Sequence, residues 1–269
     1  MVEPLRLLCV LAHPDDETLG CGGVIAKYAA EGVEVYLITA TRGERGWTGD
    51  PKDDPGLEAL GRIREAELRC AAETLGVREV HVFDYIDGEL AEADSVQATA
   101  KIVALVRRIR PHVVTTFDSF GAYGHPDHIA ISQFTQAALV CAADPSYTDP
   151  DQQPAHRASK LYFQADSIHF VKALEQLVGP IEMPVDGEIR TSIPWPEWAI
   201  TTRIDAEPHW PIVKRAAECH RSQMSAYPPL DSFSVEIHQL LWGHPTLYRV
   251  YSTVNGGRAI ERDVFEGLR

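Results

Sequence analysis

Two short stretches of the chain combine histidines with carboxylates at a spacing that suits a metal ion. They are His13-Pro14-Asp15-Asp16 and His125-Pro126-Asp127-His128. His13 and Asp16 are three residues apart in a turn, so both side chains can reach one ion. Two imidazoles and one carboxylate, from His13, Asp16 and His128, leave coordination positions open for water and a substrate, as in catalytic zinc sites. The sequence therefore predicts a divalent metal bound by these three side chains.

Both stretches come directly after a predicted buried strand and lead into a predicted helix. The strands are residues 5–11 and 112–117, which are short runs rich in branched side chains. In a parallel α/β sheet, ligands bind in the crevice at the carboxyl ends of the strands. Acidic side chains that cap a helix would explain either stretch alone. The recurrence of the pattern at two strand exits favours the metal site.

Strand and helix patterns alternate through the first half of the chain. The predicted strands are residues 5–11, 33–39, 80–83 and 112–117, and the predicted helices are residues 24–29, 57–75, 96–109 and 129–143. This alternation predicts an α/β fold with a parallel sheet covered by helices on both faces. Later candidates are strands at residues 161–163, 199–204 and 247–251, a helix at 213–224, and an irregular stretch at 180–196. We expect a core at residues 1–165 and a C-terminal elaboration at residues 166–269, packed together as one compact domain.

The composition limits the partners and the compartment. The net charge of −14 argues against nucleic acid and anionic membrane surfaces, which select basic patches. No apolar run reaches the ~20 residues needed to span a bilayer, and the first residues lack the pattern of a signal peptide. The five cysteines are widely spaced, without a C-x-x-C pair, which predicts small core residues. Together these features predict a reducing, cytoplasmic environment and leave a homo-oligomer open.

The two histidine stretches also resemble a known family. Residues 12–17 and 124–128 resemble the two signatures of the LmbE-like (PIG-L) metal-dependent de-N-acetylases, and residues 41–44, 64–68 and 220–223 resemble further motifs of that family. The resemblance implies a Rossmann-like fold and a divalent metal, usually zinc (Zn2+), with Fe2+ as an alternative. It also implies hydrolysis of the N-acetyl group of an N-acetylglucosamine-type amino sugar or its small conjugate. Residues 144–196 carry no family pattern, so the choice of conjugate stays open.

This chemistry needs a base beside the metal and a donor for the oxyanion. A bound divalent metal lowers the pKa of water to about 7 and polarises the amide carbonyl. By analogy with the family, Asp15 takes the proton from the water and passes it to the leaving amine. His125, when protonated, could donate a hydrogen bond to the tetrahedral oxyanion. Asp127 either keeps His125 protonated or only caps the following helix.

Four further residues are predicted to bind the substrate. They are Arg64, Tyr123, Glu44 and Asp87. Arg64 follows a long polar loop, residues 41–56, and the resemblance assigns it to substrate hydroxyls or phosphate; the alternative is a helical ion pair with Glu67. The other three lie in loops on the crevice side of the predicted sheet. His220 matches the late family motif, but we predict a packing or surface role for it.

Other functions are consistent with parts of this pattern. With the same fold, the chain could be an amidase that acts on a thiol conjugate, or an inactive sugar-binding protein. Two histidines and one carboxylate also hold iron(II) for oxygen chemistry, although the strand–helix alternation argues against that class. A serine nucleophile is disfavoured, because the sequence contains no Gly-x-Ser-x-Gly elbow. The favoured partner is a small amino-sugar substrate.

Overall fold

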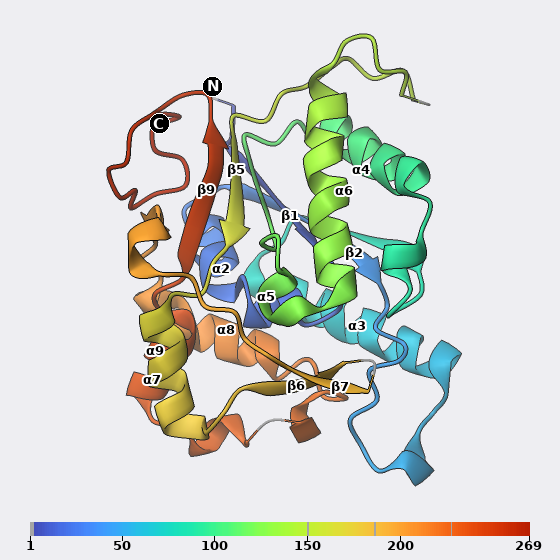
Figure 1. Cartoon of the computed structure of the whole chain (residues 1–269), viewed down its shortest axis with the longest axis vertical. Coiled ribbons are helices and arrows are strands. Elements are labelled where there is room, and N and C mark those ends of the chain that lie inside the picture. Colours follow the sequence, from blue (N-terminus) through green and yellow to red (C-terminus); the bar gives the residue numbers. More distant parts are fainter. Residues whose placement is uncertain (1–2, 150, 186, 227) are drawn as a thin grey trace.

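A seven-stranded sheet forms the centre of the computed structural model, which describes residues 3–149, 151–185, 187–226 and 228–269 (Figure 1). Its strands are β1 (Arg6–Leu11), β2 (Glu34–Thr41), β3 (Glu79–Tyr85), β4 (Val113–Thr116), β5 (Lys160–Gln164), β8 (Thr202–Arg203) and β9 (Thr246–Ser252). The order is β3-β2-β1-β4-β5-β9-β8, in which β1 to β5 are parallel and β9 is antiparallel to both neighbours. β6 (Glu182–Val185) and β7 (Glu188–Thr191) form a separate hairpin. The order 3-2-1-4-5 confirms the Rossmann-like α/β prediction.

Helices cover both faces of this sheet (Figure 1). They are α1 (Asp16–Leu19), α2 (Gly22–Ala30), α3 (Leu57–Leu75), α4 (Ser95–Ile109), α5 (Gly121–Gly124), α6 (Pro126–Ala143), α7 (Ile168–Val178), α8 (Trp210–Ala217) and α9 (Val235–Trp242). α4 and α6 pack together on one face, and α2, α3 and α8 pack together on the other, as right-handed crossovers require. Across the described ranges, no helix combines the length and the apolar character that crossing a membrane requires.

The central strands and the helices beside them follow the sequence pattern closely. β1 and β2 are buried apart from their first residues, so their sequences are apolar on both faces instead of alternating. α3 spans the predicted residues 57–75 and ends at Gly76, whose φ of 83° is left-handed. α6 begins earlier than predicted, because Nδ1 of His125 accepts the backbone N–H of Asp127 and Pro126 occupies the first turn. His128 therefore lies in the first turn of a helix.

The C-terminal part departs further from the sequence-based expectation. The predicted elements do not include α7 and α9, and residues 180–196, expected to be irregular, contain the β6–β7 hairpin. α8 ends at Ala217 and not near residue 224, because the following residues turn back to bond with α1 and α3. β8 and β9 extend the same sheet that contains β1. The division into a core and an elaboration at residue 165 stays a prediction.

The prediction that the cysteines serve as small core residues does not hold for two of them. Cys70 on α3 and Cys219, just after α8, form a disulfide with a Cα–Cα distance of 5.9 Å. Cys9 and Cys21 are buried free thiols, and Cys141 is partly buried. The cysteines therefore no longer support a reducing compartment.

A buried ion pair fastens the C-terminal tail to the sheet. Lys160 on β5 is fully buried, and its Nζ lies 2.7 Å from Oε1 of Glu261. The hydroxyls of Tyr162 and Thr202 donate to Oε2 of Glu261 at 2.7 and 3.0 Å. Burial raises the pKa of Glu261, but hydrogen bonds from Asn255 and Lys160 outweigh burial and hold that pKa at about 2.

We expect Glu261→Gln to lower the free energy of unfolding by about 3 kcal/mol at pH 7. The folded-state pKa of Glu261 lies below its ordinary value of 4.5, so the contribution is complete above that value and is lost as the pH falls towards 2. Urea unfolding of both proteins at pH 7, 5, 4 and 3 measures the difference. A difference that stays constant down to pH 3 would contradict the assignment.

Candidate metal centre

The predicted metal ligands meet where the strand order reverses direction. β1 and β4 are neighbours, but the helix after β1 covers one face of the sheet and the helix after β4 covers the other. The chain segments that leave the two strands therefore diverge and open a crevice between them. Residues 12–17 leave β1 and residues 117–128 leave β4, which brings His13 and His128 together.

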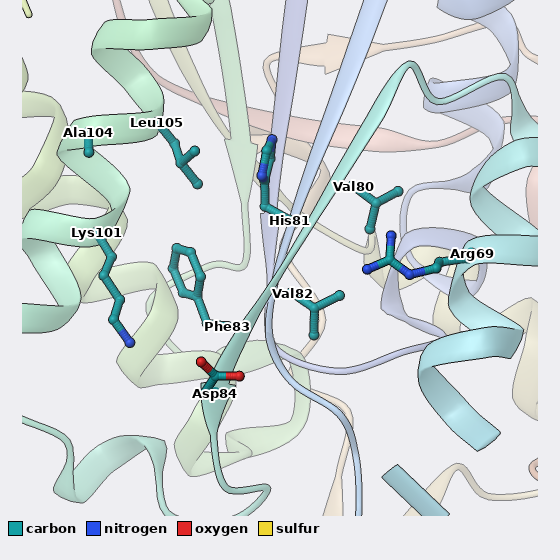
Figure 2. A pocket seen from close by; sticks show the side chains of 9 residues that line it. All are labelled: Arg69, Val80, His81, Val82, Phe83, Asp84, Lys101, Ala104 and Leu105. Atoms are coloured by element: carbon teal, nitrogen blue, oxygen red, sulfur yellow. The ribbon is translucent and has the colours of Figure 1, made fainter. Parts of the chain in front are cut away.

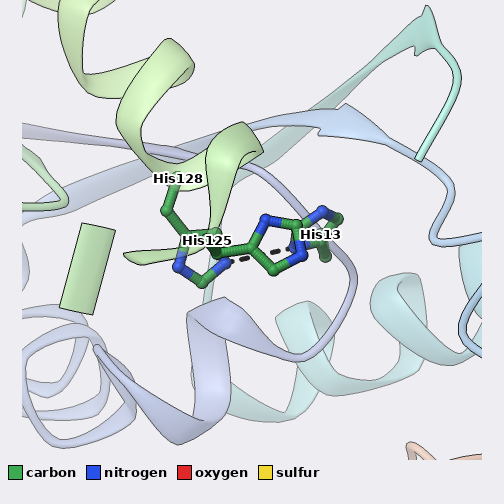
Figure 3. A group of neighbouring side chains, drawn as sticks. All are labelled: His13, His125 and His128. Atoms are coloured by element: carbon green, nitrogen blue, oxygen red, sulfur yellow. Dashed lines mark hydrogen bonds between the residues drawn. The ribbon is translucent and has the colours of Figure 1, made fainter. Parts of the chain in front are cut away.

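The three residues predicted to bind the metal come together in this crevice, and Figure 3 shows two of them, His13 and His128. Nδ1 of His13 lies 3.2 Å from Nε2 of His128 and 3.7 Å from Oδ2 of Asp16. Oδ1 of Asp16 lies 3.5 Å from Nε2 of His128. Ligand atoms around a tetrahedral zinc ion at ~2.1 Å lie about 3.4 Å apart, so the spacing of the two histidine nitrogens fits one ion, whereas Asp16 approaches each of them with a different oxygen. Around His13, the described groups whose ligand atoms all lie within 4.8 Å of one another are His13 with His125 and His128, and His13 with Asp87 and Asp127. Two imidazoles with one carboxylate suit zinc or iron(II) better than magnesium or calcium, which prefer oxygen ligands.

The far side of each histidine ring is held by an acceptor. Nε2 of His13 lies 3.1 Å from Oδ2 of Asp127 and 3.2 Å from Oδ1 of Asp87. Nδ1 of His128 lies 3.3 Å from the carbonyl oxygen of Gly121. When these nitrogens carry the ring protons, Nδ1 of His13 and Nε2 of His128 present their lone pairs to each other and to Asp16. Acceptors behind metal-binding histidines fix the ring orientation in this way.

The crevice shifts the pKa values of His13 and His128 in opposite directions. Burial lowers the pKa of His13, but the carboxylates of Asp127 and Asp87 outweigh burial and hold that pKa well above the usual value. Burial and the neighbouring His13 lower the pKa of His128 well below the usual value. Burial raises the pKa of Asp16 to about 7. Opposed shifts of buried neighbours are typical of functional sites.

Asp15 lies beside these groups in an unusual backbone conformation. Its φ of 118° is left-handed, and its carboxylate Oδ2 accepts a hydrogen bond from Nη2 of Arg64 at 3.0 Å. Arg64 is only 4% exposed and also donates to the carbonyl oxygens of Gly43 and Pro14. The alternative ion pair with Glu67 is wrong, because Glu67 accepts hydrogen bonds from Ser222. In this structure Arg64 contacts the predicted base.

His125 and Tyr123 lie on the β4 side of the same crevice. The ring of His125 lies 4.7 Å, centre to centre, from the rings of both His13 and His128 (Figure 3). The ring of Tyr123 lies 5.3 Å from that of His128. The Asp127 carboxylate contacts His13 and accepts the backbone N–H groups of Gly88 and Leu90, and its role towards His125 stays a prediction.

The remaining predicted residues contact protein groups. Oδ2 of Asp87 accepts the backbone N–H of Arg45, while Oδ1 contacts His13. Burial raises the pKa of Asp87, but the contact with His13 outweighs burial and lowers that pKa to about 2. Glu44 is buried and accepts the backbone N–H of Arg42. Substrate contacts of Asp87 and Glu44 stay predictions.

One buried pair beside the crevice was missed by the sequence reasoning. Nε2 of His220 lies 2.7 Å from Oε1 of Glu17, and both side chains are buried. Of the two roles predicted for His220, the surface role is therefore wrong, and a buried role is what the structure shows. The resemblance of residues 220–223 to a family motif is the one sequence feature that points to His220.

A separate hollow of about 520 Å³ lies along the outer edge of β3 (Figure 2). Side chains of β3 point to both sides of the strand, with Arg69 of α3 on one side and Lys101 of α4 on the other. Its lining contains none of the predicted site residues. We therefore place the candidate site in the crevice between β1 and β4.

Comparisons with known proteins show the family and the fold of the chain. Residues 8–139 match the family model described as PIG-L, GlcNAc-PI de-N-acetylase. A relative from Rhodococcus jostii, named 1D-myo-inositol 2-acetamido-2-deoxy-alpha-D-glucopyranoside deacetylase, is 33% identical over 98% of both chains. The N,N'-diacetylchitobiose deacetylase of Pyrococcus horikoshii has a TM-score of 0.67 at 21% identity, covering 91% of this chain and 83% of its own. The protein TT1542 of Thermus thermophilus has a TM-score of 0.65 at 24% identity, covering 94% and 97%. These two structures support the fold alone.

We expect a graded loss of divalent-metal binding in this centre. His13→Ala and His128→Ala remove a ligand atom and should abolish tight binding of one zinc ion per chain. Asp127→Asn keeps the ligands but weakens the acceptor behind His13, so affinity should fall about 10–100-fold. Competition titration with a coloured chelator measures the affinity, and Asp84→Asn, at an exposed carboxylate, is the control. Tight zinc binding by both alanine variants would contradict the proposed ligands.

Proposed function

The chain belongs to the PIG-L family and is therefore a hydrolase of amide bonds, and we propose that it removes the N-acetyl group from an N-acetylglucosamine-type amino sugar or its small conjugate. The observation that carries the proposal is the close approach of His13 and His128, 3.2 Å between Nδ1 and Nε2, with the Asp16 carboxylate next to both and Asp15 adjoining Asp16. The names of the relatives, which specify a glucosaminide of inositol, support a sugar conjugate of similar size.

We propose zinc as the metal, held by His13, Asp16 and His128; iron(II) fits the same ligands. When bound, the ion would lower the pKa of water and polarise the acetyl carbonyl. Oδ2 of Asp16 already accepts the backbone N–H groups of Ala12 and His13 at 3.2 and 2.7 Å. The other carboxylate oxygen, Oδ1, would therefore be the one that binds the ion.

Asp15 is the proposed general base and acid. Burial raises the pKa of its carboxyl, and Arg64 opposes that rise. A raised pKa suits a group that takes a proton from water and then returns it to the leaving amine. Arg64 also fixes the direction of the carboxylate through the 3.0 Å contact between Nη2 and Oδ2.

His125 is the proposed donor to the oxyanion. Its Nδ1 accepts the backbone N–H of Asp127, so the proton of the neutral ring resides on Nε2. A neutral His125 can therefore donate from Nε2, and protonation at Nδ1 would cost the helix cap. We propose that Tyr123, whose ring lies 5.9 Å from that of His125, adds its hydroxyl to this interaction.

Hydrolysis of a sugar amide is tested by measuring amine release from the zinc-loaded protein. The panel contains N-acetylglucosamine, N-acetylglucosaminides of inositol and of other small alcohols, acyl thiol conjugates, and acetyl-lysine peptides. We expect release from the small glucosaminides. Release only from thiol conjugates would favour the amidase alternative, and binding of sugars without release would favour a sugar-binding protein. A cytoplasmic location stays a prediction.

We expect Asp15→Asn to keep the metal and to lower kcat by about 10²–10⁴-fold, as loss of a general base does. Asparagine tolerates a left-handed backbone, so the φ of 118° is not a reason for the variant to misfold. Asp205→Asn, at an exposed carboxylate in the C-terminal part, is the matched control. Turnover near that of the control, with metal bound, would remove Asp15 from the mechanism.

A further inference from the structure

The proposed mechanism gives no role to the buried charged pair Glu17–His220, which lies beside the crevice. Glu17 is 0% exposed and His220 is 1% exposed, and they are joined by the 2.7 Å contact between Oε1 and Nε2. The hydroxyl of Thr18 donates to the same Oε1. Removing ionisable groups from water is costly, so a pair at this depth needs compensation from its geometry or its function.

The second oxygen of Glu17 reaches the backbone of the proposed base. Oε2 accepts a hydrogen bond from the backbone N–H of Asp15 at 3.0 Å. Asp15 is the residue with the left-handed φ of 118°, a conformation that non-glycine residues keep only when their surroundings enforce it. Glu17 therefore holds the main chain of Asp15, while Arg64 holds its side chain.

His220 is itself placed by a short segment, residues 219–223, that bonds to α3 and to the loop after β2. Cys219 is joined to Cys70 of α3, and the backbone and hydroxyl of Ser222 donate to Glu67 of α3 at 2.8 and 2.7 Å. Nε2 of Gln223 donates to the carbonyl oxygen of Gly46 at 2.9 Å. α3 is also the helix that carries Arg64, so the segment that places His220 is attached to the helix that holds the Asp15 side chain.

We propose that Glu17 and His220 are positioning residues for Asp15, through which the C-terminal part of the chain aligns the base with the metal centre. The proposal rests on the function proposed above for Asp15. His220 orients the Glu17 carboxylate, and Glu17 keeps the Asp15 backbone in the conformation that directs its carboxylate to Arg64. Neither residue needs to touch the substrate.

Steady-state kinetics with metal analysis form the first arm of the test. In Glu17→Gln one acceptor oxygen becomes a donor, so either Asp15 or His220 loses its partner. We expect kcat to fall about 10²-fold in Glu17→Gln and His220→Ala, the loss that a misplaced reactive group causes, with KM changed less than about threefold and one metal bound. His220→Gln keeps an amide donor for Glu17 and should recover about tenfold of the lost kcat.

The matched control is Glu261→Gln, which breaks the other buried pair, with Lys160. It should lower stability while leaving kcat and KM unchanged, because a merely structural pair acts on folding alone. An equal loss of kcat in Glu261→Gln, or kcat within threefold of the natural protein in both Glu17→Gln and His220→Ala, would overturn the proposal.

Crystal structures of Glu17→Gln and His220→Ala form an arm that does not depend on activity. We expect Asp15 to leave the left-handed region and its carboxylate to separate from Nη2 of Arg64. Retention of that contact in both variants would overturn the positioning role. If the natural protein hydrolyses nothing in the substrate panel, the proposed function fails, and the structures alone still decide whether Glu17 and His220 position Asp15.

Discussion

The mutual burial of His13, Asp16 and His128 is the constraint on which the rest of the site depends. Ionisable side chains out of water persist only where partners or a ligand replace the lost hydration. Two carboxylates contact Nε2 of His13, and a backbone carbonyl oxygen contacts Nδ1 of His128. Backbone N–H groups donate to the Asp16 carboxylate. These partners come from the segments after β1, β3 and β4, so the site exists only when the sheet is assembled in its observed order.

The parts of the fold that the sequence predicts well are those in which burial is uniform. β1 and β2 are apolar throughout because both faces are covered, and α3 shows a helical pattern that ends at a glycine. α7 and α9 do carry apolar residues at helical spacing, so the sequence contains a signal for them that the prediction missed. The β6–β7 hairpin is short and β7 is mostly exposed, so few buried positions mark it. The early start of α6 depends on a histidine that acts as an N-cap, which residue preferences alone do not anticipate.

For the site, the sequence predicts local groups but not their distant partners. His13 with Asp16, and His125 with His128, are recognisable because spacing within a turn limits where the side chains can go. The contacts of Asp127 and Asp87 with His13, and of Arg64 with Asp15, join segments that only the assembled sheet brings together. Asp127 illustrates this difference. It lies only two residues after His125 in the sequence, but its carboxylate contacts His13 on the other side of the crevice.

The disulfide between Cys70 and Cys219 joins residues separated by 149 positions in the chain. A cross-link of this kind acts mainly on the unfolded chain, whose loop-closure entropy it removes, by about 5 kcal/mol for so long a loop in the chain-entropy model. That contribution depends on loop length and is shared by the whole chain. The balance between thiol and disulfide in the surroundings therefore governs how readily the entire protein unfolds, and also how firmly the segment that carries His220 is attached to α3.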